Sequence, residues 1–173
     1  MILDNAHIRY LKEDDLPAIM QLQEETILGL KDKTLLRRNS SEILLQSISG
    51  ENIALGVFLD DELIAIGLTV LPVPPETDLR ENLQNHTVDK AMDLKLIIVK
   101  EKYRGNGLQR KLIQLMEDEA ISRGITHLCT SVSPNNPYSY NNVLAMGYEF
   151  DHQEEIYGGL LRNIYVKELK AKD

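Results

Sequence analysis

The spacing of apolar positions alternates along the chain between a period of two, typical of strands, and a period near 3.6, typical of helices. Strands are expected over 6–11, 52–59, 63–71, 93–99, 126–132, 148–157 and 160–169. Helices are expected from Asp14 or Asp15 to about Gly29, from Ser40 or Ser41 to Gly50, from Leu108 to near Gly124, and from Asn136 to Met146. Each helix therefore ends at or beside a glycine, the residue that closes helices most readily.

The connections indicate how these elements join. The segments 60–62 and 158–159 are short enough to make tight hairpins. Residues 76–89 form a long polar connection, and loops of that length are often functional. The run LIIV at the end of 93–99 suggests a central strand buried on both faces. The pattern predicts one α/β (α+β) domain over 1–173, with three layers, a mixed central sheet of about six to seven strands and helices on both faces.

Composition and charge narrow the class of protein. A chain of 173 residues that is 43% hydrophobic and 27% charged suits one soluble domain. The net charge of −8 argues against nucleic acid as a partner and mildly favours a cationic small molecule, although solubility is the simpler explanation. One cysteine, Cys129, excludes an internal disulfide, and neither a signal peptide nor an apolar run of the ~18 residues that span a membrane is visible. A cytoplasmic protein without membrane contact is expected.

The stretch YRGNGLQRKL, residues 103–112, places glycines and basic residues where a strand gives way to a helix. Gly105 and Gly107 let the backbone take a positive φ and approach a ligand, and the free N–H groups of a first helical turn point outward. The spacing is neither that of the Walker phosphate loop nor that of the dinucleotide fingerprint, which needs a glycine where Arg110 stands. The stretch therefore predicts an anion site, most obviously for phosphate.

The charges along the helix that follows indicate the same kind of ligand. Arg110 and Lys111 lie at its N-terminus, whereas Glu117, Asp118 and Glu119 lie toward its C-terminus. This order opposes the helix dipole, which disfavours such exposed charges by about 0.3–1 kcal/mol each. A polyanion bound at the N-terminus would account for the basic end. The alternative is a solvated helix face on which the basic residues pair with neighbouring acids.

The run LIIVKEKYRGNGLQRKL resembles the acetyl-CoA motif of the Gcn5-related N-acetyltransferases, written [RQ]-x-x-G-x-[GA]. Arg104 and Gly107 match its first and fourth positions, and Gly105 with the preceding Tyr103 suits the frequent YRG form. Gln109 departs from the motif, because glycine or alanine is usual there.

A later segment, NNPYSYNNVLAMGYEF, resembles the family pattern N-x-x-A-x-x-L-Y-x-x-x-G-[FY]. Asn136 and the pair Gly147-Tyr148 match this pattern, while Ser139 stands for alanine and Asn142 for leucine. The order of elements also resembles the family over 6–169. The resemblance implies the acyl-CoA N-acyltransferase fold of that family.

The resemblance also implies how acetyl-CoA, the acyl donor, would be bound. The backbone of Ile97, Ile98 and Val99 would pair with the pantetheine arm, and an N–H of Ile98 or Val99 would stabilise the oxyanion. The pyrophosphate would be held by Arg104, Gly105, Asn106, Gly107, Leu108 and Gln109. Asn136, Ser139 and Asn142 would face the pantetheine from the later helix. No metal is expected, since the histidines and Cys129 show no metal-ligand spacing.

The catalytic acid is where the chain departs from the family. Val143, which cannot donate a proton, stands where the resemblance places a tyrosine. Tyr140, nearly one helical turn earlier, is the candidate acid, and Tyr138 is the second candidate. Aromatic packing is the alternative for both tyrosines, and water could protonate a thiolate, because a thiol pKa is only about 8.5.

The candidates for the catalytic base lie before the glycine stretch in the sequence. Asp93, at the head of the predicted central strand, could act directly or through water, and a strand-edge carboxylate is the alternative. Asp89 and His86 in the preceding loop are weaker candidates.

The resemblance implies an N-acetyltransferase that moves an acetyl group from acetyl-CoA to a primary amine by direct attack, and a small-molecule acceptor is expected because the sequence shows no peptide-binding or nucleic-acid signal. The resemblance leaves room for a homodimer. It often places the acceptor near the last hairpin, at Tyr157, Gly158, Gly159 and Arg162, where a tight turn and a solvated arginine are the alternative. A CoA-binding sensor without catalysis is the rival function, favoured by Val143. A nucleotide-phosphate binder of another fold is the third.

Overall fold

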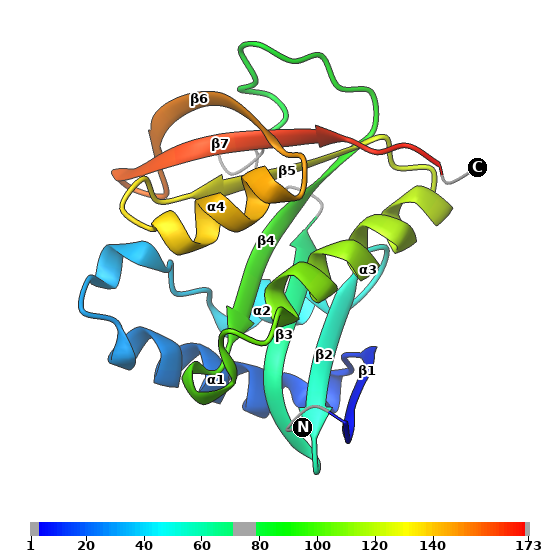
Figure 1. Cartoon of the computed structure of the whole chain (residues 1–173), viewed down its shortest axis with the longest axis vertical. Coiled ribbons are helices and arrows are strands. Elements are labelled where there is room, and N and C mark those ends of the chain that lie inside the picture. The colour runs from blue at the N-terminus through cyan, green and yellow to red at the C-terminus, as the bar shows by residue number, and fades with distance from the viewer. Residues whose placement is uncertain (1–3, 71–78, 172–173) are drawn as a thin grey trace.

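The computed structural model describes residues 4–70 and 79–171. Figure 1 shows one twisted sheet with helices on both of its faces. The sheet has seven strands in the order β1-β2-β3-β4-β5-β7-β6. The strands are β1 (Ala6–Tyr10), β2 (Ala54–Leu59), β3 (Glu62–Val70), β4 (Ala91–Val99), β5 (His127–Val132), β6 (Glu149–Ile156) and β7 (Leu160–Glu168). The α-helices are α1 (Leu16–Gly29), α2 (Ser41–Ser47), α3 (Leu108–Ser122) and α4 (Pro137–Ala145). The predicted three-layer α/β fold is confirmed.

The elements follow the predicted order, and their ends differ by a few residues. β4 begins earlier than predicted, at Ala91, and α2 ends earlier, at Ser47. The sequence predicts that the side chain of Asp14 or Asp15 caps α1. Asp15 is the N-cap residue, but its side chain makes no cap hydrogen bond, because its Oδ2 instead binds the Nη1 of Arg9 at 2.8 Å. Residue 71, the predicted end of β3, and the prolines after it lie outside the described residues.

The two faces of the sheet have separate apolar layers. On one face, Leu112 and Met116 of α3 and Val143 of α4 are buried in one cluster. On the other face, Ile19 of α1 and Leu44 of α2 are buried in a second cluster. Each such side chain stabilises the fold by roughly 1.5–3 kcal/mol when fully buried. In the part of the chain that is described, no helix is long and apolar enough to cross a membrane.

Strands β4 and β5 pair over only part of their length. They run parallel from the pair Ala91–His127 to the pair Leu94–Thr130 and then separate. Figure 1 shows their arrows diverging. On its other side, β4 stays paired with β3 as far as Val99. One edge of β4 therefore lacks a strand partner after Leu94, and we call this opening the fork.

A bulge in β4 lies at the start of the fork. Leu68 of β3 pairs with Leu96, whereas the next residue, Thr69, pairs with Leu94, so Lys95 is the extra residue. A bulge changes the direction of a strand and turns the side chains that follow it. Here it places Leu96 in the apolar layer under α1 and α2, whereas Leu94 before it belongs to the layer under α3.

Candidate active site

A groove of about 820 Å³ opens at the fork. All the predicted cofactor residues except Asn106 line it, namely Ile97, Ile98, Val99, Arg104, Gly105, Gly107, Leu108, Gln109, Asn136, Ser139 and Asn142. Asn106 lies within the same turn, where its amide donates to the carbonyl oxygens of Tyr103 at 3.0 Å and Arg104 at 3.4 Å. Asn106 therefore stabilises the turn through these backbone contacts.

The unpaired edge of β4 supplies backbone hydrogen-bonding groups to the groove. The N–H of Lys100 donates to the carbonyl oxygen of Ile64 on β3 at 2.8 Å. Because successive residues of a strand direct their backbone groups to opposite edges, the N–H of Ile98 also points to β3. Those of Ile97 and Val99 point to the fork. Between the two oxyanion donors that the resemblance suggested, the backbone direction favours Val99 over Ile98.

The glycine turn joins this edge to α3. Gly105 and Gly107 have φ of +80° and +74°, and a Cβ built on either would meet no atom within 4 Å. The glycines are therefore required by backbone conformation, and the space above them is open. No side chain caps the N-terminus of α3. Arg104 donates from Nε to the carbonyl oxygen of Val99 at 3.1 Å. An uncapped helix N-terminus, open space and an arginine suit a pyrophosphate.

A polar bridge connects the start of α3 to α4. Asn142 donates to Oε1 of Gln109 at 2.8 Å, and Arg110 donates to Oδ1 of Asn142 at 2.8 Å. Gln109 also contacts the hydroxyl of Ser139 at 3.5 Å. Gln109, which departs from the family motif, thus bridges the two helices that border the groove. Because an amide oxygen is the acceptor for Arg110, this contact leaves the positive charge of the arginine without a counter-charge.

The candidate tyrosines of α4 lie in different surroundings. Tyr138 lines the groove and is 61% exposed. Tyr140 is partly buried and packs against the apolar layer under α3, and it is not among the lining residues of the groove. Val143, at the position of the usual tyrosine, is buried in the same layer. The structure thus brings Tyr138, and not Tyr140, to the groove.

Asp93 lies in the middle of the sheet. It pairs with Val70 of β3 and Cys129 of β5, and it is 4% exposed, so it is not the strand-edge carboxylate considered as its alternative. Its Oδ2 accepts from the N–H of Leu79 at 3.3 Å. The negative charge of Asp93 acts on Lys95 and Tyr157, because it tends to raise the pKa of both.

Two cations contact the ring of Tyr157 beside the groove. The guanidinium carbon of Arg37 lies 4.3 Å from the ring centroid, and the Nζ of Lys95 lies 4.7 Å from it. The Tyr157 hydroxyl is 3.4 Å from the hydroxyl of Ser131. Burial, and then the charge of Arg37, lower the pKa of Lys95 to about 8. We call Arg37, Lys95, Ser131 and Tyr157 the Tyr157 cluster.

The last hairpin contributes Tyr157 to this cluster. Tyr157 has a φ of +54°, which is unusual for a bulky residue, and Gly158 and Gly159 also have positive φ. Arg162 is 4% exposed and donates to the carbonyl oxygen of Thr34 at 2.6 Å, so it is not the solvated arginine of the alternative. Burial lowers the pKa of Arg162. Arg162 thereby holds the connection before α2, which carries Arg37, against β7.

Arg37 and Lys95 are the residues that sequence reasoning missed. A lysine in the apolar run MDLKLIIV was a visible signal, since a charged residue within a buried strand needs a reason. Arg37 gave no such signal, because it lies in a basic and polar connection where an arginine is ordinary.

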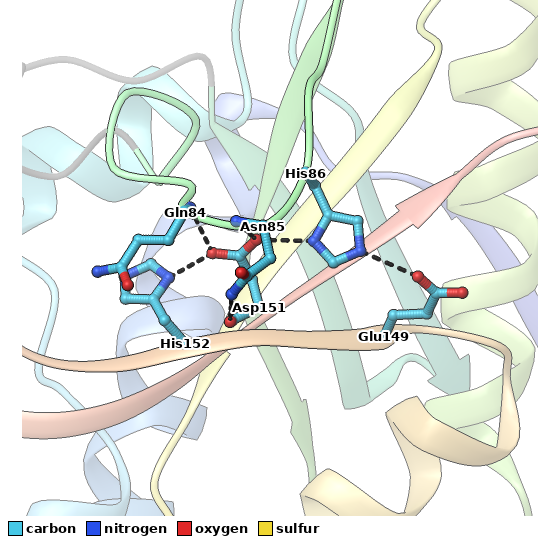
Figure 2. A network of polar contacts seen from close by, with 6 residues as sticks. All are labelled: Gln84, Asn85, His86, Glu149, Asp151 and His152. Atoms are coloured by element: carbon cyan, nitrogen blue, oxygen red, sulfur yellow. Dashed lines mark hydrogen bonds and ion pairs between the residues drawn. The ribbon is translucent and has the colours of Figure 1, made fainter.

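A second polar cluster surrounds Asp151, whose side chain is fully buried. Figure 2 shows its carboxylate between His86 and His152, with the backbone of Gln84 and Asn85 beside it. The backbone N–H groups of Gln84 and Asn85 donate to this carboxylate at 2.8 and 2.9 Å. Burial alone would raise the pKa of Asp151, but these donors and both histidines outweigh it and lower the pKa to about 2. This Asp151 cluster fastens the loop before β4 to β6.

His86, a weaker candidate base, belongs to the Asp151 cluster. Its ring nitrogens lie 2.7 Å from Asp151 Oδ1 and 2.9 Å from Glu149 Oε2, and the two carboxylates raise its pKa. His86 lines a separate cavity of about 620 Å³ together with His127. Its position supports a structural role. Among the described residues, no group of three or more His, Cys, Asp or Glu side chains could hold a metal ion.

Three solved structures resemble this chain over nearly its whole length. The ribosomal-protein-S18-alanine N-acetyltransferase of Escherichia coli has a TM-score of 0.70 and 17% identity, with 97% of this chain and 96% of that chain covered. An N-acetyltransferase from Staphylococcus aureus Mu50 has a TM-score of 0.73 and 16% identity, covering 96% and 100%. The yncA protein of Salmonella typhimurium, solved with its cofactor acetyl-CoA, has a TM-score of 0.71 and 15% identity, covering 98% and 97%. At these identities the likeness establishes the fold alone.

Sequence comparison identifies the family. No curated protein sequence matches this chain. The family described as the acetyltransferase (GNAT) family matches residues 31–148, which include the fork, the glycine turn and most of the groove. The match spans well over half of the sequence, and the chain therefore belongs to the acetyltransferase (GNAT) family.

Proposed function

We propose that this protein transfers an acetyl group from acetyl-CoA to the primary amine of a small molecule, by direct attack within a ternary complex. The observation that carries the proposal is the fork, where an unpaired strand edge leads into a glycine turn at an uncapped helix N-terminus. A strand edge suits an extended amide-bearing arm, and the turn suits a pyrophosphate. A small-molecule acceptor is favoured because the Tyr157 cluster is partly buried and lies within the electrostatic reach of Asp93 and Arg162, which are each 4% exposed.

Acetyl-CoA would supply the activated thioester when bound. The residues that would hold it are Arg104, Gly105, Gly107 and Gln109 at the turn, and Asn136 and Ser139 on α4, with Asn106 supporting the turn and Ile97 and Val99 offering backbone groups. The N–H of Val99 would stabilise negative charge that develops on the carbonyl oxygen. Its fixed direction into the fork requires no rearrangement during the reaction.

The acceptor amine must lose a proton before it attacks, since an amine with a pKa near 10.4 is only about 0.1% neutral at pH 7. Asp93 is our candidate for the proton acceptor, directly or through water, because its buried charge acts on the Tyr157 cluster. For the thiolate leaving group, Tyr138 is the better placed of the two tyrosines, and water is sufficient at a thiol pKa of about 8.5. Tyr140→Phe should therefore keep most of the turnover.

The rival proposal is a CoA-binding sensor that does not catalyse transfer. It is favoured by Val143, which is buried in the apolar layer and offers no proton. In the sensor, acetyl-CoA would bind and no amine would be acetylated. We place the protein in the cytoplasm, where a single buried thiol stays reduced. Size-exclusion chromatography with light scattering would show whether the protein is a monomer or a homodimer.

The experiment measures CoA thiol release with a panel of polyamines, amino acids and aminoglycosides, and ligand binding by thermal shift with acetyl-CoA, ATP and NAD. We expect stabilisation by acetyl-CoA only and thiol release with at least one amine. Gly107→Trp should abolish acetyl-CoA binding, because the indole would fill the open space over the turn. Gly124→Trp is the matched control, since Gly124 has the same φ of +74° at the other end of α3.

Each contrary outcome of this experiment has its own meaning. Binding without thiol release on any amine would favour the sensor. Stabilisation by ATP or NAD rather than acetyl-CoA would favour a nucleotide binder. Equal loss of acetyl-CoA binding in Gly107→Trp and Gly124→Trp would contradict our assignment of the pyrophosphate site.

A further inference from the structure

The Tyr157 cluster adjoins the groove at the fork. Arg37 directly follows Leu36, a residue that lines the groove, and Lys95 lies two positions before Ile97, which also lines it. Ser131 is the first residue of β5 beyond its pairing with β4. The cluster therefore lies at the base of the fork, where β4 and β5 begin to separate, and an acceptor bound there would meet the thioester end of the cofactor.

Positive charge converges in this cluster. Arg37 and Lys95 contact one aromatic ring, and Arg162 lies close enough for its charge to lower the pKa of Tyr157. The Nη1 atom of Arg37 is buried, and it has no hydrogen-bond partner among the residues that the structure describes. A buried guanidinium nitrogen without an acceptor costs free energy, so a fold selected only for stability would supply one.

Tyr157, whose ring contacts these two cations, has an unusual backbone conformation. A φ of +54° at Tyr157 is costly for a bulky residue and persists where surrounding contacts enforce it. Here the contacts are the two cations and the hydroxyl of Ser131. Four segments far apart in sequence thus meet where two cations contact one ring.

We infer that the Tyr157 cluster binds a carboxylate of the acceptor, so that the substrate is an amine that also carries a carboxylate. This inference rests on the proposed function, which makes the acceptor an amine substrate. Anion binding at the cluster can nevertheless be measured without turnover. Arg37 offers the carboxylate an N–H that has no partner among residues 4–70 and 79–171, and Lys95 offers a second positive group. The amine end would lie toward Asp93, the negative group of the same region.

A carboxylate fits this site better than a phosphate does. Asp93 offsets part of the positive charge of Arg37 and Lys95, and the negative charge of Asp32 acts on Arg162. A single added negative charge therefore comes closest to balance, whereas a doubly charged phosphate would exceed it. A guanidinium also matches the planar geometry of a carboxylate. The net charge of −8 for the whole chain does not describe this site, where the local charge is positive.

Binding is tested by calorimetry on the full chain saturated with CoA. The probes are the N-acetyl derivatives of glycine, β-alanine, 4-aminobutanoate and 5-aminopentanoate, each paired with its carboxamide. We expect at least one carboxylate to bind about tenfold more tightly than its amide, as for a charge-assisted hydrogen bond. Equal binding within every pair would overturn the inference, and so would tighter binding of N-acetyl phosphoethanolamine than of every carboxylate.

Variants attribute the preference to the cluster. Arg37→Met should abolish the preference for carboxylate over amide, and Arg37→Lys should restore part of it. Arg38→Met is the matched control, because Arg38 is exposed and pairs with Glu24 at 2.6 Å. A preference that survives in Arg37→Met, or that disappears equally in Arg38→Met, would contradict the assignment.

Turnover separates this inference from the proposed function. The amino acids above are compared with alkylamines of the same length in the thiol-release assay. We expect Arg37→Met to lower kcat/KM about ten times more for the preferred amino acid than for the alkylamine. Carboxylate binding without turnover would refute only the proposed function. Turnover of alkylamines as fast as of every amino acid would refute the inference and leave the proposed function intact.

Discussion

The Asp151 cluster and the Tyr157 cluster are both partly buried groups of charged and ring-bearing side chains. They differ in whether the surrounding protein supplies partners for the buried charges. The Asp151 carboxylate accepts hydrogen bonds from two backbone N–H groups and contacts two histidine rings, and its pKa falls to about 2. In the Tyr157 cluster two cations share one ring, the pKa of Lys95 falls to about 8, and Arg37 Nη1 has no acceptor among the described residues.

This difference distinguishes a structural cluster from one suited to a ligand. In the first, the charged form of the buried carboxylate is stabilised by the protein itself. In the second, the protein disfavours its own charged lysine, and an added anion would relieve that cost. Substitutions should therefore change stability at the first cluster and ligand selectivity at the second.

The largest effect on stability is expected from Asp151→Asn. Loss of the buried charge weakens four hydrogen bonds at once and should lower the free energy of unfolding by about 3 kcal/mol, as measured by urea denaturation. Glu155→Gln, an exposed position on the same strand, should change it by less than about 0.5 kcal/mol. If Asp151→Asn lowered the free energy of unfolding by less than about 1 kcal/mol, the cluster would not be the structural anchor we describe.

Lys95→Met should have a smaller effect of the opposite sign. The substitution keeps the apolar stem and removes a disfavoured buried charge, so stability should stay equal or rise by up to about 1 kcal/mol. The measurement is the same urea denaturation. If Lys95→Met lost as much stability as Asp151→Asn, the Tyr157 cluster would be structural too, and the comparison would fail.

The smallest effects are the slopes of stability against pH, which have opposite signs in the two clusters. His86 has a raised pKa, so its contribution is complete below about pH 6.5 and is lost as pH rises through the folded pKa. Lys95 has a pKa lowered to about 8, so the folded state binds fewer protons between about pH 8 and 10.5 and stability rises across that window. Thermal unfolding across pH should show His86→Gln removing the first slope and Lys95→Met the second. Slopes unchanged by these substitutions would contradict the assignments.

Much of the fold could be predicted from sequence because its signals are local. The helices end at glycines, and the hairpins are marked by short polar or glycine turns. The bulge at Lys95 could not be predicted, because it depends on how β3 pairs with β4. A strict alternation through MDLKLIIV would have placed the wrong residues under α1 and α2.

The glycine turn and the Tyr157 cluster also differ in how far they could be predicted from the sequence. The glycine turn beside the groove could be predicted because one continuous stretch supplies the turn and the helix N-terminus, with positive φ at Gly105 and Gly107 as expected. The Tyr157 cluster is assembled from the connection before α2, the bulge of β4, the end of β5 and the last hairpin. No single stretch of sequence carries that arrangement, so only the folded chain brings Arg37 and Lys95 together.

The most direct test of the account is a crystal structure of the chain with CoA and the N-acetyl amino acid that binds most tightly. We predict the pyrophosphate over residues 105–109, the pantetheine arm along the free edge of β4, and the product carboxylate within hydrogen-bonding distance of Arg37 and close to Lys95. A carboxylate directed away from Arg37 and Lys95, or a CoA molecule bound outside the fork, would contradict it.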